Sequence, residues 1–438
     1  FWIYGVAAVL AWFVHRHLAL RITFGIAAFT VIAYGAVYAG PAGAFLPGGP
    51  GPLLAAVWQA WTAYNPDIER VRLAEWADIV ITNKAPVREA SLEGAKNLKL
   101  IAVAATGTDV VDVKAANARG ITVSNIRNYA INTVPEHTFA LILALRRSII
   151  PYRQSVGQGR WREAAQFCYF DYPIRDLAGA TLGVIGDGVL GKAVAKLGEA
   201  FGMTVLFSDY KGTTGMGPLY TPFLEVLRRS DVITLHLPRT AETRGWLDAD
   251  AFDQMKDGVR IVNCARGELI VDAALQAALD SGKVAGAALD VFPAEPITDY
   301  PLFDGYDNVV VTPHLGASTA EAQDRAGVQT AEQVVAALTG GVVATAVNVP
   351  AIGAEDLEVL APFVPLCRQL GRLAAVLAEG TSIDQVEIEC LGRIAERDTR
   401  LLAVSVLLGV LSGHTEEAVN EVNAPAIAEE RGIRVTET

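Results

Sequence analysis

The chain has 438 residues, of which 52% are hydrophobic and 19% are charged. This length predicts two or three domains, and the composition excludes a disordered or collagen-like chain. The formal net charge of −12 leaves no basic surplus to neutralise phosphates, so we expect no nucleic-acid partner. The four cysteines are scattered without a C-x-x-C pair, which indicates neither a disulfide framework nor a zinc site. The cysteine pattern suits a reducing cytoplasm.

The first 57 residues differ from the rest, because Arg16 and Arg21 are their only strong charges. The run 22–46 is long and apolar enough to span a bilayer as a helix, with the basic cluster before it on the cytoplasmic side. Three interpretations stay open: a membrane anchor, a foreign sequence fused to the body, or an apolar segment packed on the body. A Gly- and Pro-rich linker over 40–52 follows.

From residue 77 onward, short β-rich runs alternate with helical runs, as in parallel βαβ units. We predict strands at 78–82, 98–103 and 121–124, with helices at 91–97 and 112–119 between them. A longer helix is predicted over 133–150, ending at Pro151, because proline cannot extend a helix interior.

A second alternating unit opens at Thr181, and six strands separated by helices are typical of a doubly wound nucleotide-binding sheet. We predict these strands at 181–185, 204–208, 232–235, 260–263, 285–289 and 309–312. A helix over 320–338 then leaves this unit. Beyond residue 348 we expect a smaller α+β module, with helices at 356–378 and 399–411 and a strand at 385–389.

The predicted strand 181–185 runs directly into a G-x-G-x-x-G motif at Gly186, Gly188 and Gly191, and a helix-forming run follows. Gly186 permits the tight turn, Gly188 lets the backbone approach a pyrophosphate, and Gly191 allows close packing of helix on sheet. The helix N-terminus favours the phosphate charge. This context predicts a dinucleotide site.

The next predicted strand is followed by Asp209, about 20 residues after the glycines, where an acid accepts hydrogen bonds from the adenosine ribose. The same carboxylate repels a 2′-phosphate, so NAD is favoured over NADP, although Lys211 leaves some tolerance for NADP. The alternative interpretation is an ordinary strand–turn–helix with a surface aspartate.

Three polar segments, 263–267, 290–296 and 312–316, follow predicted strand ends, where the ligand crevice of such a sheet lies. Oxidation of a 2-hydroxy acid needs a base for the hydroxyl proton, a cation for the carboxylate and a partner for the base. His314, Arg266 and Glu295 supply these three types. We interpret His137 and His236 as structural, and Cys264 as a small packed residue rather than a nucleophile.

Together these motifs resemble the D-2-hydroxyacid dehydrogenase family over roughly residues 74–438, in particular its glycerate and 3-phosphoglycerate dehydrogenase branches. The resemblance implies an α/β protein with a doubly wound parallel-sheet Rossmann domain and a discontinuous flavodoxin-like substrate domain. The expected divisions are an apolar N-terminal extension at 1–57, a first part of the substrate domain at 58–148, the NAD-binding domain at 149–314, a return to the substrate domain at 315–349, and a C-terminal α+β module at 350–438 that resembles the intervening domain of phosphoglycerate dehydrogenase.

By the same resemblance Arg266 binds the substrate carboxylate and carbonyl oxygen, His314 is the acid/base, and Glu295 is its partner. The implied substrate contacts are the backbone of Ala105, Thr106 and Gly107, together with Arg266 and His314. The implied NAD contacts are Gly186, Gly188, Val189, Leu190, Gly191, Asp209, Leu237, Pro238, Thr243, Cys264, Ala265, Arg266, Asp290, His314 and Gly316. No metal is implied.

The chain also departs from the family. The opening strand–helix–strand unit of the family is replaced by residues 1–57 and a short bridge, so two strands of the substrate domain are expected to be absent. Phosphoglycerate dehydrogenases usually carry an arginine for the phosphate at the place of Val103, and its absence favours D-glycerate and hydroxypyruvate here. The opposing interpretation is that an arginine elsewhere reaches the phosphate, for example Arg127 in the loop after the strand 121–124.

Residues from about 236 onward instead resemble D-3-phosphoglycerate dehydrogenases of serine biosynthesis, which is the alternative function. An inactive or NAD-sensing fusion protein is the second alternative. We expect a small 2-hydroxy or 2-keto acid as substrate, a homodimer or homotetramer, a cytoplasmic body, and membrane association only if residues 1–57 are an anchor.

Overall fold

The computed structural model describes residues 77–213, 215–297, 299–302, 305–339, 342–349, 354–378, 382–415 and 419–438. The expectations for residues 1–57, a membrane anchor included, lie outside the described residues. Within the described ranges, no helix is both long and apolar enough to cross a membrane. The chain divides into two compact units: Asn128–Gln323 forms one, and the residues before and after it form the other.

The unit Asn128–Gln323 is built on one parallel sheet of seven strands in the order β10-β9-β8-β7-β4-β5-β6. The chain starts in the middle at β4 and winds outward in both directions, which is the doubly wound topology predicted from the sequence. The strands are β4 (Thr181–Ile185), β5 (Thr204–Ser208), β6 (Tyr220–Thr221), β7 (Val232–Leu235), β8 (Val259–Asn263), β9 (Val284–Leu289) and β10 (Val309–Val311). The two-residue strand β6 is too short to give a pattern in the sequence and was not predicted.

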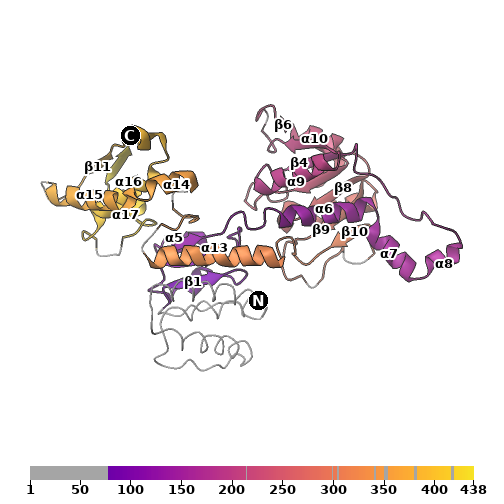
Figure 1. Ribbon diagram of the computed structural model, residues 1–438, viewed down its shortest axis with the longest axis horizontal. Helices are drawn as coiled ribbons and strands as arrows, with labels where there is room; N and C mark the ends of the chain where they lie inside the picture. The colour runs from indigo at the N-terminus through magenta and orange to yellow at the C-terminus, as the bar shows by residue number, and fades with distance from the viewer. Residues whose placement is uncertain are drawn as a thin grey trace, which may run out of the picture. The chain divides into compact units, whose positions relative to one another are not determined.

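Helices cover both faces of this sheet (Figure 1). On one face, α6 (Thr133–Arg146) and α9 (Val189–Ala200) bury Phe139 and Val194 against Leu182 of β4. A second buried cluster contains residues of the other helices, α10 (Phe223–Arg229), α11 (Ala249–Gln254) and α12 (Asp272–Asp280), together with the short 3₁₀ turn Gly267–Leu269. Burial on both faces explains why the central strands are mostly apolar: β7 has one polar residue, Thr234, and β8 has two, Arg260 and Asn263.

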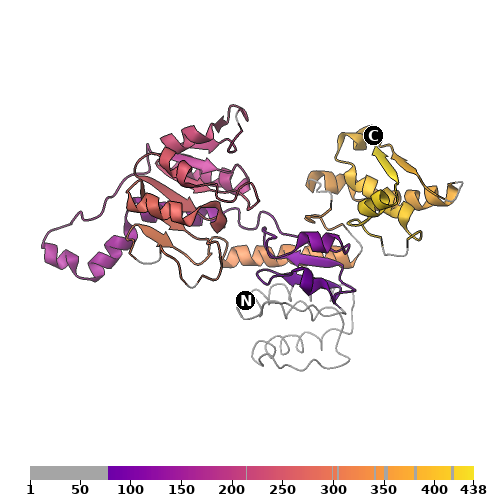
Figure 2. The same cartoon turned by 180° about the vertical axis from the view of Figure 1, so that it is seen from behind.

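The single helix predicted over 133–150 is wrong, because the chain turns at Ser148, whose φ is +48°. A new helix, α7 (Ile149–Gly157), begins there, and Pro151 lies in its first turn, where a missing N–H breaks no helical hydrogen bond. With α8 (Arg160–Ala164), it forms an extension that points away from the sheet in both views (Figures 1 and 2). The compact unit begins upstream of the expected 148/149 boundary, because α6 packs on this sheet.

The other unit contains a parallel sheet of three described strands, β1 (Ile79–Thr82), β2 (Leu100–Val103) and β3 (Thr122–Ser124), with helices α4 (Glu89–Leu92) and α5 (Val113–Asn117). The helix α13 (Ala320–Leu338) brings the chain back to this sheet (Figure 2). Ala331 and Val334 of α13 pack with Leu100 and Ala102 of β2. The sheet and its covering helix therefore come from distant parts of the sequence.

The C-terminal module contains α14 (Ala354–Leu360), α15 (Phe363–Leu377), β11 (Gln385–Ile388), a 3₁₀ turn (Gly392–Glu396), α16 (Arg400–Leu411), α17 (Ala424–Glu430) and β12 (Arg434–Glu437). Strands β11 and β12 pair in parallel. The helix predicted over 356–378 is two helices, because the chain is interrupted before α15, whose N-cap is Pro362.

Candidate functional site

The glycine turn after β4 has the geometry that a dinucleotide requires. Gly186 has φ of +107°, and a Cβ there would lie 2.6 Å from the carbonyl oxygen of His236. A Cβ on Gly191 would lie 2.0 Å from the carbonyl oxygen of Gly186, so both positions exclude any side chain. At Gly188 a Cβ would meet nothing within 4 Å. The space beside Gly188, at the N-terminus of α9, suits a pyrophosphate.

Asp209, directly after β5, is only 2% exposed. Its backbone N–H donates to the carbonyl of Thr221 at 2.8 Å, but its Oδ1 is buried with no hydrogen-bond partner among the described residues. A buried oxygen of this kind is costly unless a donor reaches it. The ribose hydroxyls of NAD are donors of the required kind, so the residues present fit the cofactor.

Other predicted cofactor contacts lie at the ends of β7 and β8. Leu237 is buried and Pro238 is exposed, and Thr243 donates its hydroxyl to the Pro238 carbonyl at 2.6 Å, closing that turn. Cys264 and Ala265 follow β8. Burial raises the pKa of Cys264 to about 12, so the thiol stays protonated near neutral pH, consistent with a packed residue.

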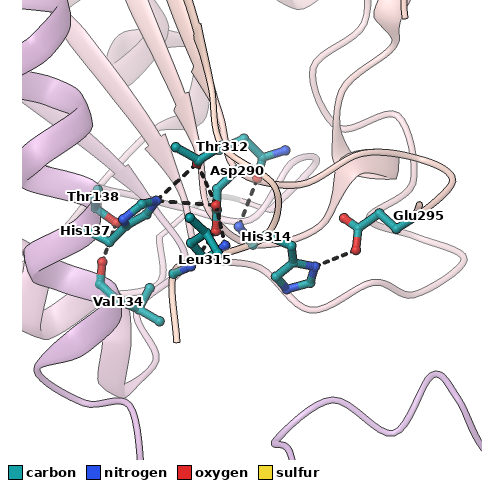
Figure 3. A network of polar contacts seen from close by, with 11 residues as sticks. Val134, His137, Thr138, Asp290, Glu295, Thr312, His314 and Leu315 are labelled. Carbon is teal, nitrogen blue, oxygen red and sulfur yellow. Dashed lines mark hydrogen bonds and ion pairs between the residues drawn. The ribbon is translucent and has the colours of Figure 1, made fainter. Parts of the chain in front are cut away.

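His314 and Glu295 come together as expected (Figure 3). His314 Nδ1 lies 2.5 Å from Glu295 Oε2, and the other oxygen of Glu295 accepts the backbone N–H of Phe292 at 2.9 Å. A carboxylate can only accept, so Nδ1 of His314 carries the proton and Nε2 is left to exchange one. Both side chains remain about one-third exposed, which leaves them accessible to a substrate.

The backbone of His314 is held in an unusual conformation, with φ of +54°. Non-glycine residues rarely adopt this region, and it persists only where the surroundings enforce it. Asp290 does so: its carboxylate accepts the N–H groups of the next two residues, Leu315 at 2.7 Å and Gly316 at 2.8 Å. Asp290 therefore fixes the turn that presents His314.

Asp290 has further partners within the chain. It accepts the hydroxyl of Thr312 at 2.6 Å, and His137 Nε2 of α6 lies 3.3 Å from the same oxygen (Figure 3). Burial opposes the charge of Asp290, but these hydrogen bonds outweigh it and hold the pKa below its usual value. A Cβ on Gly316 would lie 2.9 Å from Asp290, so the close approach requires glycine.

Arg266 lies on a loop that packs against the segment carrying Glu295. A Cβ on the next residue, Gly267, would lie 2.0 Å from the carbonyl carbon of Phe292. The side chain of Asn263 ties this loop, donating to the Arg266 carbonyl at 2.8 Å and accepting the N–H of Ala265 at 3.0 Å. Arg266, Glu295 and His314 are thus all carried by segments that meet at the carboxyl edge of one sheet.

The predicted substrate loop Ala105–Gly107 belongs to the other unit. Thr106 donates its hydroxyl to the Ile126 carbonyl at 2.9 Å, and Asn125 donates to the Thr106 carbonyl at 2.8 Å. The expectation that Val103 stands at a phosphate-facing position is wrong for its side chain. Val103 is 1% exposed and lies in a hydrophobic core, because it is the last residue of β2, a strand buried on both faces. Arg127, by contrast, is exposed.

Several functional candidates were missed or undervalued in the sequence. His137 of α6, which we interpret as structural, contacts Asp290. Tyr129 lies close enough to Arg266 for that cation to lower its pKa, although burial raises the pKa more. Tyr220 donates its hydroxyl to Asp187 within the glycine turn, and this bond holds the pKa of Asp187 low. No spacing in the sequence links these pairs. Burial lowers the pKa of His236 to about 4, so this histidine is neutral near pH 7.

Comparison with family models gives two matches. Residues 139–316 match the D-isomer specific 2-hydroxyacid dehydrogenase NAD binding domain. Residues 359–438 match the D-3-phosphoglycerate dehydrogenase intervening domain. The first range contains the glycine turn, Asp209, Arg266, Glu295 and His314.

Comparison with individual known proteins agrees with these two family-model matches. A glycerate dehydrogenase of Methylorubrum extorquens is 48% identical over 274 residues, 62% of this chain and 86% of that protein. A D-3-phosphoglycerate dehydrogenase of Mycobacterium bovis is 42% identical over 362 residues, 82% of this chain and 67% of that protein. The structure of an Aquifex aeolicus D-lactate dehydrogenase complexed with NAD and lactic acid matches with a TM-score of 0.54 and 33% identity, covering 60% of this chain and 84% of that one. The chain belongs to the D-2-hydroxyacid dehydrogenase family and carries its NAD-binding domain.

Proposed function

We propose that this protein is an NAD-dependent dehydrogenase that transfers hydride reversibly between NAD and a small D-2-hydroxy acid, D-glycerate, with hydroxypyruvate as the oxidised partner. The observation that carries the proposal is the His314–Glu295 pair at 2.5 Å, set beside the Arg266 loop at the carboxyl edge of the doubly wound sheet. NAD, when bound, supplies the hydride acceptor, and Asp209 with the glycine turn would hold it.

In the proposed mechanism, His314 Nε2 takes the proton from the substrate hydroxyl. At the same time, hydride leaves the carbon that bears this hydroxyl. Glu295 accepts the Nδ1–H throughout, so it fixes the ring and stabilises the imidazolium that forms. Arg266 binds the substrate carboxylate as a cation with paired donors. In the reverse direction the imidazolium returns the proton to the oxygen of the keto acid.

We assign the remaining residues by their contacts. Asp290 and Gly316 act through the turn that presents His314, so we propose them as positioning residues rather than direct cofactor contacts. The family resemblance supports a role for the backbone of Ala105, Thr106 and Gly107 in binding the substrate carboxylate, and roles for Val189, Leu190 and the β7–β8 residues in binding NAD.

D-3-phosphoglycerate is the second candidate substrate, favoured by the match of residues 359–438 to the intervening domain of phosphoglycerate dehydrogenases. The run 103–108 is neutral, which disfavours a phosphate, and the exposed Arg127 directly after the Asn125–Ile126 segment is the cation best placed to serve one. A doubly charged phosphate needs such a partner.

The deciding experiment measures NADH oxidation by the full chain with hydroxypyruvate and with 3-phosphohydroxypyruvate. We expect a higher kcat/KM for hydroxypyruvate. A strong preference for the phosphorylated substrate that is lost in Arg127→Ala would establish the second candidate instead. Binding of NADH without turnover of either substrate would indicate an NAD-sensing protein and overturn both.

We also propose a homo-oligomer formed through the α7–α8 extension. The loop that follows α8 contacts both helices: Arg160 pairs with Asp171 at 2.7 Å and Tyr152 donates to the Tyr172 carbonyl at 2.8 Å. Phe167 and Phe170 nevertheless stay 93% and 75% exposed. Exposed large aromatic side chains close together in the chain are typical of a surface that a second copy covers. Analytical ultracentrifugation of the full chain should show an oligomer, and a monomer in the double variant Phe167→Asp/Phe170→Asp; an unchanged mass in that variant would exclude this surface.

A further inference from the structure

The sequence predicts that Lys211 leaves some tolerance for NADP, but its ammonium group is paired with acceptors of the chain. Its Nζ lies 2.7 Å from Asp248 Oδ2 and 3.3 Å from the carbonyl oxygen of Trp246. Lys211 is two residues from Asp209, and two residues span at most about 7 Å of chain. A lysine side chain of ordinary length at this position can therefore reach the surroundings of the Asp209 carboxylate when it is free.

The acceptors that hold Lys211 are themselves firmly placed. Trp246 is 5% exposed and packs edge-on against Phe223 with ring centroids 5.8 Å apart. Asp248 is the N-cap of α11, and its Oδ1 accepts the N–H of Ala251 at 2.9 Å. Burial raises the pKa of Asp248, but the hydrogen bonds from Lys211 and Ala251 outweigh it, so the net shift is downward. The carboxylate is ionised at neutral pH.

Asp248 thus uses its two oxygens for two purposes: Oδ1 caps a helix and Oδ2 holds a cation. A helix cap needs only one acceptor, and asparagine caps as well as aspartate. The second oxygen is therefore not required by the helix. It withdraws a positive charge from the end of β5, where Asp209 stands and where a 2′-phosphate would arrive.

We propose that Asp248 is a cofactor-specificity residue: by pairing with Lys211, it disfavours binding of NADP, whose adenosine ribose carries a 2′-phosphate. Discrimination against NADP then has two parts: the negative charge of Asp209 repels the 2′-phosphate, and Asp248 removes the cation that would compensate for it. Rejecting the wrong ligand by denying it a partner is a general route to specificity. This inference rests on the proposed use of NAD by the same site.

The test is Asp248→Asn in the full chain, since asparagine keeps the Ala251 cap and loses the charge that holds Lys211. The dissociation constants of NAD⁺ and NADP⁺ are measured by isothermal titration calorimetry, independently of turnover. We expect NADP⁺ to bind about three- to tenfold more tightly than to the unmodified protein, with NAD⁺ changed by less than about twofold. The increase in affinity for NADP⁺ should become smaller as salt is added, because the new contact between Lys211 and the 2′-phosphate is ionic and exposed.

Two further variants make the result specific. Asp248→Asn combined with Lys211→Gln should lose the gain for NADP⁺, because the freed ammonium is then absent. The matched control is Asp257→Asn, which breaks a similar pair with Lys283 at 2.8 Å just before β8, at the opposite edge of the sheet from the glycine turn. It should leave both affinities unchanged.

An Asp248→Asn protein that binds NAD⁺ normally and shows no gain for NADP⁺ would overturn the inference and leave the proposed function standing. Equal loss of both affinities together with a lower melting temperature would also overturn it, since the pair would then be structural. Failure of the unmodified protein to bind NAD⁺ would instead count against the proposed function.

Discussion

Asp209 and Asp290 each directly follow a strand of the same sheet, and both are buried, at 2% and 1% exposure. They differ in what their oxygens contact. Asp209 keeps one oxygen without a hydrogen-bond partner among the described residues, whereas both oxygens of Asp290 accept backbone or side-chain donors. Asp209 therefore has an oxygen that can accept a hydrogen bond from a ligand, whereas the oxygens of Asp290 hold the backbone of the turn at Leu315 and Gly316.

The position of a residue at the end of a strand is therefore not enough to tell whether it binds a ligand or positions another residue. Motif comparison places both aspartates among the NAD contacts. Only the hydrogen bonds distinguish them, because each oxygen of Asp290 already accepts a donor from the chain, whereas Oδ1 of Asp209 accepts none among the described residues. Substitutions at His314, Asp290 and Asp209 test this distinction.

The largest effect is expected for His314→Ala. Loss of the group that exchanges the substrate proton should lower kcat about 10²–10⁴-fold, with a much smaller change in KM. Steady-state NADH oxidation with hydroxypyruvate measures both. Arg266→Ala is the matched comparison, because it should raise KM as well as lower kcat. Full activity in His314→Ala would remove the catalytic assignment and with it the reason for the Asp290 network.

Asp290→Asn should have the next largest effect, lowering kcat by up to about 10²-fold through misplacement of His314. Asparagine has one acceptor oxygen, so one of the two N–H groups of Leu315 and Gly316 loses its partner. Combining it with His314→Ala should cause little further loss, because the two residues act in one unit. A fully additive loss would mean that Asp290 contributes independently of His314.

Asp209→Asn tests the other member of the comparison and should leave kcat for bound cofactor nearly unchanged. We expect NAD⁺ affinity to fall about tenfold, the size usual for a hydrogen bond to a charged group, and the lead of NAD⁺ over NADP⁺ to narrow. Because the Asp209 oxygen has no partner without ligand, the melting temperature of the ligand-free protein should not fall, whereas that of Asp290→Asn should. Equal destabilisation by the two substitutions would break the comparison.

The smallest effect concerns acid stability. The folded pKa of Asp290 lies below its unfolded value of about 3.9, so the charge stabilises the fold fully above that pH and is lost as the pH falls through the folded pKa. The difference in unfolding free energy between the unmodified protein and Asp290→Asn should therefore be constant from pH 6 to about pH 5 and shrink below about pH 4. Urea unfolding at each pH measures it. A difference that grows on acidification would have the wrong sign.

Local patterns in the sequence were sufficient for the doubly wound sheet, the glycine turn and the three residues that we propose as catalytic. The turn at Gly186 demands positive φ and close backbone approach, which glycine alone meets easily, so it leaves a visible signature. The ends of parallel strands converge on one edge of a sheet, so His314, Arg266 and Glu295 could be grouped without coordinates.

Short or interrupted elements were less predictable. The strand β6 has only two residues, and the break between α6 and α7 depends on the conformation of Ser148 rather than on Pro151. A helix break of this kind leaves little trace in composition, because a serine in the left-handed region is rare and its neighbours favour helix on both sides.

Residue types, periodicity and turn chemistry are properties of neighbouring residues, so the sequence by itself determined the fold class, the dinucleotide turn and the two residues that we propose as the acid/base pair. The tertiary structure alone decided which way side chains point and what they contact across the chain: Val103 into the core, His137 onto Asp290, and Lys211 onto Asp248. These contacts join residues far apart in sequence, or depend on the face of a strand that packing buries. No local rule encodes them, and they determine which charges are free to meet a ligand.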